Sequence, residues 1–235
     1  MQTAATILQS TFGYQAFRGE QALIIQSIVD GHDSLVVMPT GGGKSLCYQI
    51  PALLREGCGI VISPLIALMQ DQVSALNEMG VRVAFLNSTQ SQAESETVIN
   101  DALSGQLDLL YIAPERINQR TTINWLQRCQ IALIAIDEAH CVSQWGHDFR
   151  QDYLSLNQLK NDFPSVPRIA LTATATRTSQ AEIIKNLDLS NPKQFVSSFD
   201  RPNIHYTVVP KTDAKKQLLQ FLTCLLYTSD AADEE

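Results

Sequence analysis

Apolar residues in this chain gather in short continuous runs, and the stretches between the runs repeat apolar positions at helical spacing. Continuous runs of this length are typical of parallel strands, because such strands are buried on both faces of a sheet. Seven runs predict strands at residues 35–38, 60–62, 83–86, 107–112, 131–136, 169–171 and 195–196. Strands that alternate with helices in this way predict an α/β fold, with a mostly parallel sheet and helices on both faces.

One helix is especially clear after the second run. Ser63 can cap its first turn, Pro64 fits that turn and Gly80 can end the helix. The apolar positions expected to form its buried stripe are Leu65, Leu68, Met69, Val73, Leu76 and Met79. Residues 87–97 are rich in serine and glutamine, and we expect them to form a surface loop that enters the next helix.

The regular pattern weakens after residue 199. We expect residues 1–199 to form one domain, residues 200–224 to hold a junction and the start of a truncated second lobe, and residues 225–235 to be a disordered tail. Residues 204–209 are expected to be a strand and residues 214–226 a helix. The tail changes composition abruptly and resembles translated sequencing-adapter sequence, so we interpret it as non-native. An ordinary acidic tail is the alternative.

Composition narrows the class of protein. No apolar run reaches transmembrane length and no signal peptide opens the chain, so we expect a cytoplasmic protein that meets no membrane, nucleoid-associated if bacterial. The five cysteines show no C-x-x-C spacing, which argues against a zinc site and against a disulfide framework. The net charge of −7 argues against binding nucleic acid through bulk positive charge, but it leaves room for a groove of a few Arg and Lys residues.

A glycine-rich segment joins the first predicted strand to a helix. The segment consists of Thr40, Gly41, Gly42, Gly43, Lys44 and Ser45. Between a strand and a helix, such glycines let backbone N–H groups wrap around phosphate oxygens. Lys44 would reach the β- and γ-phosphates of a nucleotide, and Ser45 would bind Mg²⁺. The strict phosphate-loop pattern is not met, because Met38 stands where its first glycine belongs. A glycine-rich turn with a chance Lys-Ser pair is the alternative.

An acidic pair follows the strand predicted at residues 131–136. Asp137 and Glu138 come at its carboxyl end, the edge where open α/β sheets bind their ligands. Asp137 would hold Mg²⁺, and Glu138 would orient and deprotonate the attacking water. A solvated pair that caps the next helix is the alternative. Together with the glycine-rich segment, the pair predicts a nucleoside triphosphatase.

A segment with aromatic and polar side chains comes next. It contains Gln144, Trp145, Phe149 and Arg150. Aromatic rings stack on single-stranded bases of any sequence, and arginine pairs with phosphate. A loop whose rings pack on the protein core explains the composition equally well. His140 alone indicates little, because a lone histidine is more often a hydrogen-bonded structural residue.

Motifs throughout residues 12–210 resemble those of RecQ-family DNA helicases. The most specific is residues 141–150, which are similar to the aromatic-rich loop of that family. Phe17-Arg18 with Gln21 resembles the adenine-recognition motif, although Gly19-Glu20 replaces the usual Pro-Gly. Residues 63–72, 111–116, 170–175 and 198–203 resemble further helicase motifs. The resemblance implies a RecA-like P-loop NTPase fold and the first, ATP-binding lobe of an ATP-dependent 3′–5′ DNA helicase.

The resemblance also implies a role for each matching position. Those that would bind ATP are Tyr14, Arg18 and Gln21 at the adenine, and residues 40–45 at the phosphates. Those that would catalyse hydrolysis with Mg²⁺ are Lys44, Asp137, Glu138 and His140. Those that would bind DNA or couple it to hydrolysis are Gln144, Trp145, Phe149, Arg150, Thr172 and Thr174. Single-stranded and duplex DNA are the expected partners, ATP and Mg²⁺ the expected cofactors, and no zinc is expected.

The family's second lobe is expected to be missing from this chain. That lobe supplies an arginine finger, which in other NTPases is worth about 10³–10⁵ in rate. We therefore expect the chain alone to be inactive.

Two other hypotheses stay open. A DEAH-type RNA helicase shares Asp137-Glu138-Ala139-His140, but such proteins typically read Ser-Ala-Thr where residues 172–174 read Thr-Ala-Thr, and they lack the aromatic-rich loop. An orphan lobe that binds nucleotide or DNA without turnover is the other hypothesis. It predicts ATP binding that depends on Lys44, with no hydrolysis on any nucleic acid.

Overall fold

In the computed structural model, the seven apolar runs pair into one sheet whose strands are all parallel to their neighbours. The strands are β1 (Ser34–Val37), β2 (Cys58–Ile62), β3 (Val83–Leu86), β4 (Leu109–Ile112), β5 (Ile131–Ile136), β6 (Arg168–Thr172) and β7 (Lys193–Val196), in the order β3-β4-β2-β5-β6-β1-β7. The predicted α/β fold is confirmed, and the strand ends differ from the predicted ones by a residue or two.

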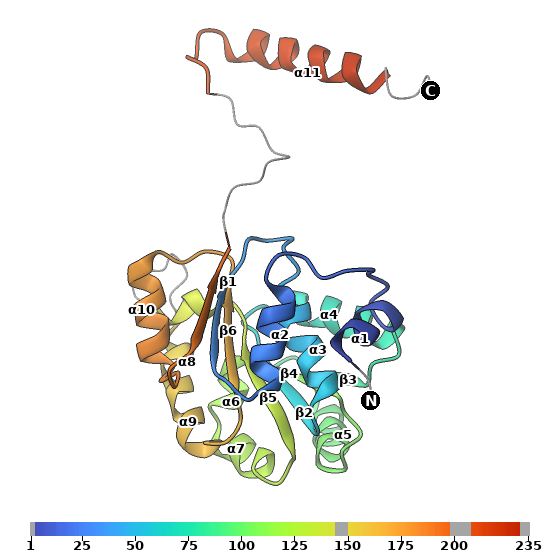
Figure 1. Ribbon diagram of the computed structural model, residues 1–235, viewed down its shortest axis with the longest axis vertical. Coiled ribbons are helices and arrows are strands. Elements are labelled where there is room, and N and C mark those ends of the chain that lie inside the picture. The colour runs from blue at the N-terminus through green and yellow to red at the C-terminus, as the bar shows by residue number, and fades with distance from the viewer. Residues whose placement is uncertain (1–2, 144–149, 198–207, 231–235) are drawn as a thin grey trace. The chain divides into compact units, whose positions relative to one another are not determined.

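The structure describes residues 3–143, 150–197 and 208–230, with only the backbone for residues 224–230. They fall into two compact units, Met1–Phe199 and Asp200–Glu235. The helices of the first unit are α1 (Ala4–Ser10), α2 (Gln21–Val29), α3 (Leu46–Leu54), α4 (Ile66–Glu78), α5 (Gln92–Leu103), α6 (Pro114–Ile117), α7 (Arg120–Leu126), α8 (Gln151–Leu154), α9 (Leu159–Asp162) and α10 (Arg177–Asn186), with 3₁₀ turns η1 (Ala139–Val142) and η2 (Ser155–Gln158). Figure 1 shows α8, α9 and α10 on one face of the sheet and α2, α3 and α4 on the other.

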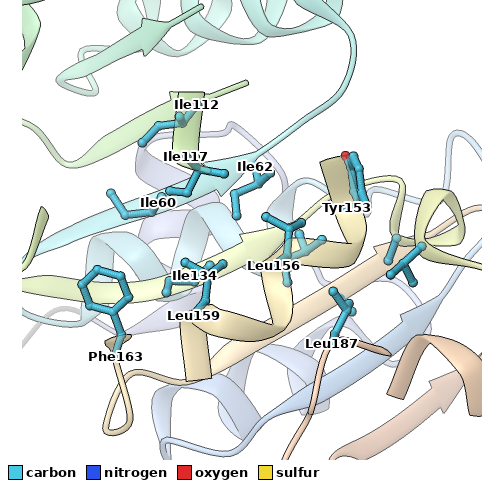
Figure 2. Packing of buried hydrophobic residues seen from close by; sticks show 14 of the residues in the cluster. Ile60, Ile62, Ile112, Ile117, Ile134, Tyr153, Leu156, Leu159, Phe163 and Leu187 are labelled. Carbon is cyan, nitrogen blue, oxygen red and sulfur yellow. The ribbon is translucent and has the colours of Figure 1, made fainter. Parts of the chain in front are cut away.

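Alternate residues of each strand supply two separate apolar cores. Ile134 and Ile136 of β5 face one core, and Leu133 and Ala135 face the other. This is the period of two that a strand imposes on its side chains. Figure 2 shows the first core, where Ile60, Ile62, Ile112 and Ile134 from the strands meet side chains from the covering layer. These are Tyr153, Leu156 and Leu159 from its helical turns and Phe163 from the residue after α9. Because both faces are covered, the strands need the continuous apolar runs that the sequence shows.

Helix α4 differs from its prediction at both its start and its buried face. It begins at Ile66, and Leu65 occupies the N-cap position with no side-chain cap. Ser63 follows β2 and is buried, and within the described residues its hydroxyl has no hydrogen-bond partner. The stripe is narrower than predicted. Its buried residues are Met69, Val73 and Leu76, whereas Leu65, Leu68 and Met79 are 46%, 36% and 46% exposed. Gly80 follows the helix with a φ of +80°, as expected of a glycine that ends a helix.

The polar segment at residues 87–97 proves to be mostly helix. Ser91 is the N-cap of α5, and its hydroxyl accepts a hydrogen bond from the Glu94 N–H. The Glu94 carboxylate accepts in return from the Ser91 N–H at 2.8 Å, which completes a capping box. The pattern Ser-x-x-Glu is the sequence signal for this helix start, and it marks the end of the loop four residues after Asn87.

The second unit contains helix α11 (Ala214–Asp230). This helix continues into residues 225–230, so the prediction of a disordered tail is wrong for these residues; residues 231–235 lie outside the described part. No glycine or proline interrupts the chain between Ala214 and Asp230, which allows the helix to continue. The strand predicted at residues 204–209 falls mostly outside the described residues, and the domain division stays a prediction. Within the described ranges, no helix is long and apolar enough to cross a membrane.

Candidate nucleotide-binding site

The glycine-rich segment is folded as a loop between β1 and α3 that only glycine can form. Gly41 and Gly43 have φ values of +79° and +77°, in the left-handed region. A Cβ atom on Gly43 would lie 2.4 Å from Nε2 of Gln21. The Gly42 N–H donates to the Pro39 carbonyl at 3.0 Å, which closes the turn. A tight glycine turn of this kind is what a backbone phosphate site requires.

Lys44 and Ser45 lie where the loop enters α3. The Lys44 ammonium group donates to the Met38 carbonyl oxygen at 3.1 Å, so it reaches back across the loop to the end of β1. Ser45 is the N-cap residue of α3. The start of a helix carries partial positive charge that favours anions. Both side chains are thus placed at the mouth of the loop.

A cavity of about 320 Å³ brings the loop and the acidic pair together. Its walls include Thr40, Gly41, Gly43, Lys44, Ser45, Leu68, Gln72, Asp137 and Glu138. Ser45 and Asp137, predicted as Mg²⁺ ligands from the sequence, both line this one cavity. Both offer the oxygen atoms that Mg²⁺ prefers, alongside the water it usually keeps. The donor set and the glycine cradle therefore fit a Mg²⁺–triphosphate group.

A second part of the site lies on the other side of the loop. A cavity of about 70 Å³ is lined by Tyr14, Ala16, Arg18, Gln21, Gly41, Gly43 and Leu46. The three residues predicted to bind adenine, Tyr14, Arg18 and Gln21, thus stand together beside the phosphate loop. Tyr14 is 49% exposed and so offers a ring face to a ligand. Gly43 and Leu46 also line a larger cavity of about 250 Å³ beside α4, so the three cavities adjoin one another.

The Gln21 side chain is held by hydrogen bonds within the protein, so it is not free to contact a nucleotide base. Its Oε1 accepts from the Arg18 N–H at 2.8 Å, and its Nε2 donates to the carbonyls of Gly42 and Gly43 at 3.1 and 3.3 Å. The side chain is 2% exposed. In this state the amide stabilises the phosphate loop, and an adenine would have to replace one of these bonds.

The acidic pair sits at the carboxyl end of β5. The Asp137 N–H still pairs with Ile62 of β2 at 2.9 Å, and the Asp137 carboxylate accepts from the Glu138 N–H at 2.9 Å. Glu138 has φ 47° and ψ 44°, a left-handed conformation that is uncommon outside glycine. Burial, and next the charge of Glu138, raise the pKa of Asp137 to about 6, against the opposing effect of Lys44.

His140 connects the acidic pair to the end of β6. Its Nδ1 lies 3.0 Å from the Thr172 hydroxyl and 3.1 Å from the Glu138 carboxylate. The Thr172 hydroxyl donates to the Thr174 carbonyl at 3.1 Å, so toward His140 it can only accept, and Nδ1 must carry a proton. Hydrogen bonds with Cys141 and with Glu138 raise the pKa of His140 to about 10. The raised pKa favours the doubly protonated ring at neutral pH.

Sheet order explains why these parts meet. β6 lies between β5 and β1, with Ala170 opposite Ile136 and Thr172 opposite Val37. The end of β6 thus separates the acidic pair from the phosphate loop, and the Met38 N–H donates to the Thr172 carbonyl at 3.1 Å. The structure brings together the residues predicted at the phosphates, the acidic pair, His140, Thr172 and Thr174.

The aromatic segment is described only at its ends. Gln144, Trp145 and Phe149 lie outside the described residues. The Arg150 N–H donates to the Cys141 carbonyl at 2.9 Å, and its guanidinium donates to the Pro64 carbonyl at 3.1 Å. Arg150 therefore links the segment to the connection between β2 and α4.

Several residues that support the site were not predicted from the sequence. The buried Tyr153, visible in Figure 2, donates its hydroxyl to the Asp137 carbonyl at 3.0 Å. Gln49 of α3 donates to Tyr111 and to Gln72 of α4 at 3.3 and 3.1 Å, and so ties two helices and β4 together behind the loop. These contacts join positions far apart in the sequence, and no local pattern signals them.

Comparison with known proteins decides the family. A family model described as DEAD/DEAH box helicase matches residues 18–183. The chain belongs to the DEAD/DEAH box helicase family. This helicase domain is 49% identical over 221 residues to ATP-dependent DNA helicase RecQ of Pasteurella multocida, covering 94% of this chain and 35% of that protein. It is also 49% identical over 220 residues to RecQ of Haemophilus influenzae, covering 94% and 36%.

The predicted resemblance to RecQ helicases is thereby confirmed, and the chain spans about a third of the length of these relatives. Among solved structures, the helicase domain matches the DUF1998 helicase MrfA with a TM-score of 0.65 at 21% identity, over 82% of this chain and 32% of that one. It matches a hypothetical ATP-dependent RNA helicase from Sulfolobus tokodaii with a TM-score of 0.60 at 20% identity, over 81% and 56%. These structural matches establish the RecA-like helicase fold alone.

Proposed function

We propose that this chain is the ATP-binding lobe of an ATP-dependent DNA helicase that moves 3′ to 5′ along single-stranded DNA and unwinds duplexes. One observation carries the proposal. The phosphate loop and the acidic pair line one cavity at the carboxyl ends of the parallel strands β1 and β5, in a chain 49% identical to RecQ helicases. The activity of the whole protein, its DNA partners and a cytoplasmic location are all part of this proposal.

In the proposed site, the loop N–H groups and Lys44 bind the β- and γ-phosphates. Ser45 and Asp137 hold Mg²⁺, which when bound neutralises the charge that develops on the phosphates. Glu138 orients and deprotonates the attacking water, and support comes from its place in the lining of the cavity that Lys44 also lines. His140 holds the Glu138 carboxylate through its protonated Nδ1.

The proposed nucleotide base site uses the side chains beside the loop. Tyr14 stacks on adenine, and Arg18 and Gln21 contact its edge. Support comes from the cavity that these three residues line together. Binding of the base would draw the Gln21 amide away from the carbonyls of Gly42 and Gly43, so base binding and loop conformation are expected to depend on each other.

The proposed DNA contacts come from Gln144, Trp145, Phe149 and Arg150. Thr172 and Thr174 report the state of the nucleotide site to this segment through His140. A second helicase lobe would complete the ATP site with an arginine finger, so we propose that this chain alone binds ATP and is inactive in hydrolysis.

Nucleotide binding by the chain tests the proposal directly. The affinity for a fluorescent ATP analogue should fall at least about tenfold in Lys44→Ala, because the cavity loses a charge that pairs with phosphate in a partly buried site. Lys185→Ala is the matched control, since Lys185 is exposed on α10, and its affinity should equal that of the parent.

Nucleic-acid preference separates the proposal from the RNA helicase hypothesis. Fluorescence anisotropy with labelled single-stranded DNA and RNA of the same base order should show tighter binding to DNA. A nucleotide affinity that is the same in Lys44→Ala as in the parent would count against the proposed function. So would clearly tighter binding to RNA than to DNA.

A further inference from the structure

Helix α10 holds the end of the turn that carries the acidic pair and His140. The Ser143 hydroxyl donates to the Glu182 carboxylate at 2.6 Å, and the Asn186 side chain donates to the Val142 carbonyl at 3.2 Å. Ser143 is fully buried, whereas Glu182 is half-buried. A hydroxyl-to-carboxylate bond of this length belongs to the strong, charge-assisted class. The residue after this contact, Gln144, begins the aromatic segment.

The same helix is joined to the nucleotide site at its other end. β6 ends at Thr172, which contacts His140 at 3.0 Å, and α10 begins five residues later at Arg177. Thr176 caps α10 by accepting from the Ser179 N–H at 3.2 Å. The segment from β6 to α10 therefore touches the η1 turn twice, once beside the acidic pair and once where the aromatic segment starts.

The Glu182 contact is not needed to attach α10 to the protein. Ile183 and Leu187 are fully buried in the core below the helix, and they anchor it through apolar contacts. The short hydrogen bond from the buried Ser143 hydroxyl to the Glu182 carboxylate has a different effect: it fixes the direction in which the chain leaves η1.

We propose that Glu182 is a positioning residue that couples the nucleotide site to the aromatic segment. A change at the His140–Thr172 contact moves β6 and α10 together, and the Glu182–Ser143 bond passes that movement to the chain that continues into Gln144. Glu182 touches neither nucleotide nor DNA in this account. The inference rests on the proposed function, because it takes residues 40–45 as the nucleotide site.

Trp145 supplies a spectroscopic test, since the chain has two tryptophans. In a Trp125→Phe background, all tryptophan emission comes from Trp145. The emission maximum and its quenching by iodide are measured with and without Mg²⁺ and the non-hydrolysable analogue AMP-PNP. We expect the parent to show a nucleotide-induced change and Glu182→Ala to lose it.

Three further variants separate positioning from a loss of structure. Glu182→Gln should keep the response, because its amide oxygen still accepts from the Ser143 hydroxyl. Ser143→Ala should lose the response, because it removes the same bond from the other side, and it answers the question even if Glu182→Ala folds poorly. Lys185→Ala, one turn away on the exposed face of α10, should respond as the parent does.

The outcomes are distinguishable from those of the proposed function. AMP-PNP binding is measured on the same samples by equilibrium dialysis. Failure of the parent to bind AMP-PNP overturns the proposed function and this inference with it. Binding without any change at Trp145 in the parent, or an undiminished change in Glu182→Ala and Ser143→Ala, overturns this inference alone.

Discussion

Asp137 and Glu138 are held in states that cost the protein stability. A non-glycine residue in the left-handed region costs about 1–3 kcal/mol, and Glu138 adopts it with φ 47°. Burial beside Glu138 raises the pKa of Asp137 to about 6, so ionising Asp137 opposes folding. The Tyr153 hydroxyl on the Asp137 carbonyl and His140 on the Glu138 carboxylate keep both residues in place. Strained or buried charged residues, whose cost to stability a bound ligand would reduce, are typical of functional sites.

The raised pKa of Asp137 makes a prediction about stability and pH. Stability from the neutral carboxyl group is fully present below the unfolded pKa of about 4 and is lost as the pH rises through about 6. Asp137→Asn keeps the oxygen that accepts from Glu138 and removes the charge. In EDTA and without nucleotide, its free energy of unfolding should exceed that of the parent, and the excess should grow by about 1 kcal/mol between pH 5 and pH 8.

Urea unfolding at both pH values measures this difference. Asp30→Asn, at the exposed end of α2, is the control and should show no such change. An excess that is the same at pH 5 and pH 8 would contradict the assignment of a raised pKa to Asp137.

The chemistry of single residues was readable from the sequence where it follows a local pattern. Residues 40–45 and the pair Asp137-Glu138 can each be recognised from a local sequence pattern. We therefore expected both to belong to one nucleotide site. The conformation of Glu138 and the bond between Ser143 and Glu182 were not, because both depend on where β5, β6 and α10 are placed in three dimensions. The assigned roles of the site residues remain predictions for experiment.

Among the elements, β1, β6 and β7 are tied at their amino ends by one buried ion pair. The Asp33 carboxylate accepts from the Arg168 N–H, the Arg168 guanidinium and the Ser190 N–H at 2.9, 2.8 and 2.7 Å. Arg168 also donates to the carbonyls of Leu187 and Asp188. Arg168 is fully buried and Asp33 is 7% exposed. This end of the sheet is opposite the nucleotide site, so the pair serves structure and not binding.

Removal of one partner should therefore destabilise the protein without changing the site. Asp33→Asn leaves the Arg168 charge buried and unpaired, which costs about 3–5 kcal/mol in comparable cases. Asp108→Asn is the matched control, because its partner Arg82 is 56% exposed and such surface pairs contribute about 0–1 kcal/mol. Urea unfolding gives the stabilities, and AMP-PNP affinity of the folded fraction should be unchanged in both. A loss below 1 kcal/mol for Asp33→Asn would contradict this account.

Element type was easier to predict than element burial. Most of the strands were predictable because they are continuous apolar runs covered on both faces; the edge strand β7 is largely exposed. The buried face of α4 was not, because which apolar residues of a helix are covered depends on its neighbours. Leu68 shows the reason: it lines the cavity beside the phosphate loop, so its exposure follows from the site and not from the helix period. The capping box of α5 carried a sequence signal, Ser91 and Glu94, that our prediction did not use.

At the scale of the whole molecule, sheet topology determines how the site is coupled. The order β5-β6-β1 places the end of β6 between the acidic pair and the phosphate loop, and α10 leads from that end to the start of the aromatic segment. A ligand that binds the phosphate loop and the acidic pair together therefore joins the ends of β1 and β5, with β6 held between them. Such a ligand should stabilise the first unit as a body, and the stabilisation should require both halves of the site.

Thermal unfolding measures this linkage. At a concentration one hundred times its dissociation constant, Mg²⁺ with AMP-PNP should add about 2.7 kcal/mol to the free energy of unfolding, which for a domain of this size raises Tm by roughly 5–10 °C. EDTA should remove most of the shift, because in the proposed site Ser45 and Asp137 bind nucleotide through the metal, and without the metal Asp137 would repel phosphate. Ser45→Ala should reduce the shift, and Ser104→Ala, at the exposed end of α5, should leave it intact. An equal shift with and without EDTA would mean that the acidic pair takes no part in binding the nucleotide.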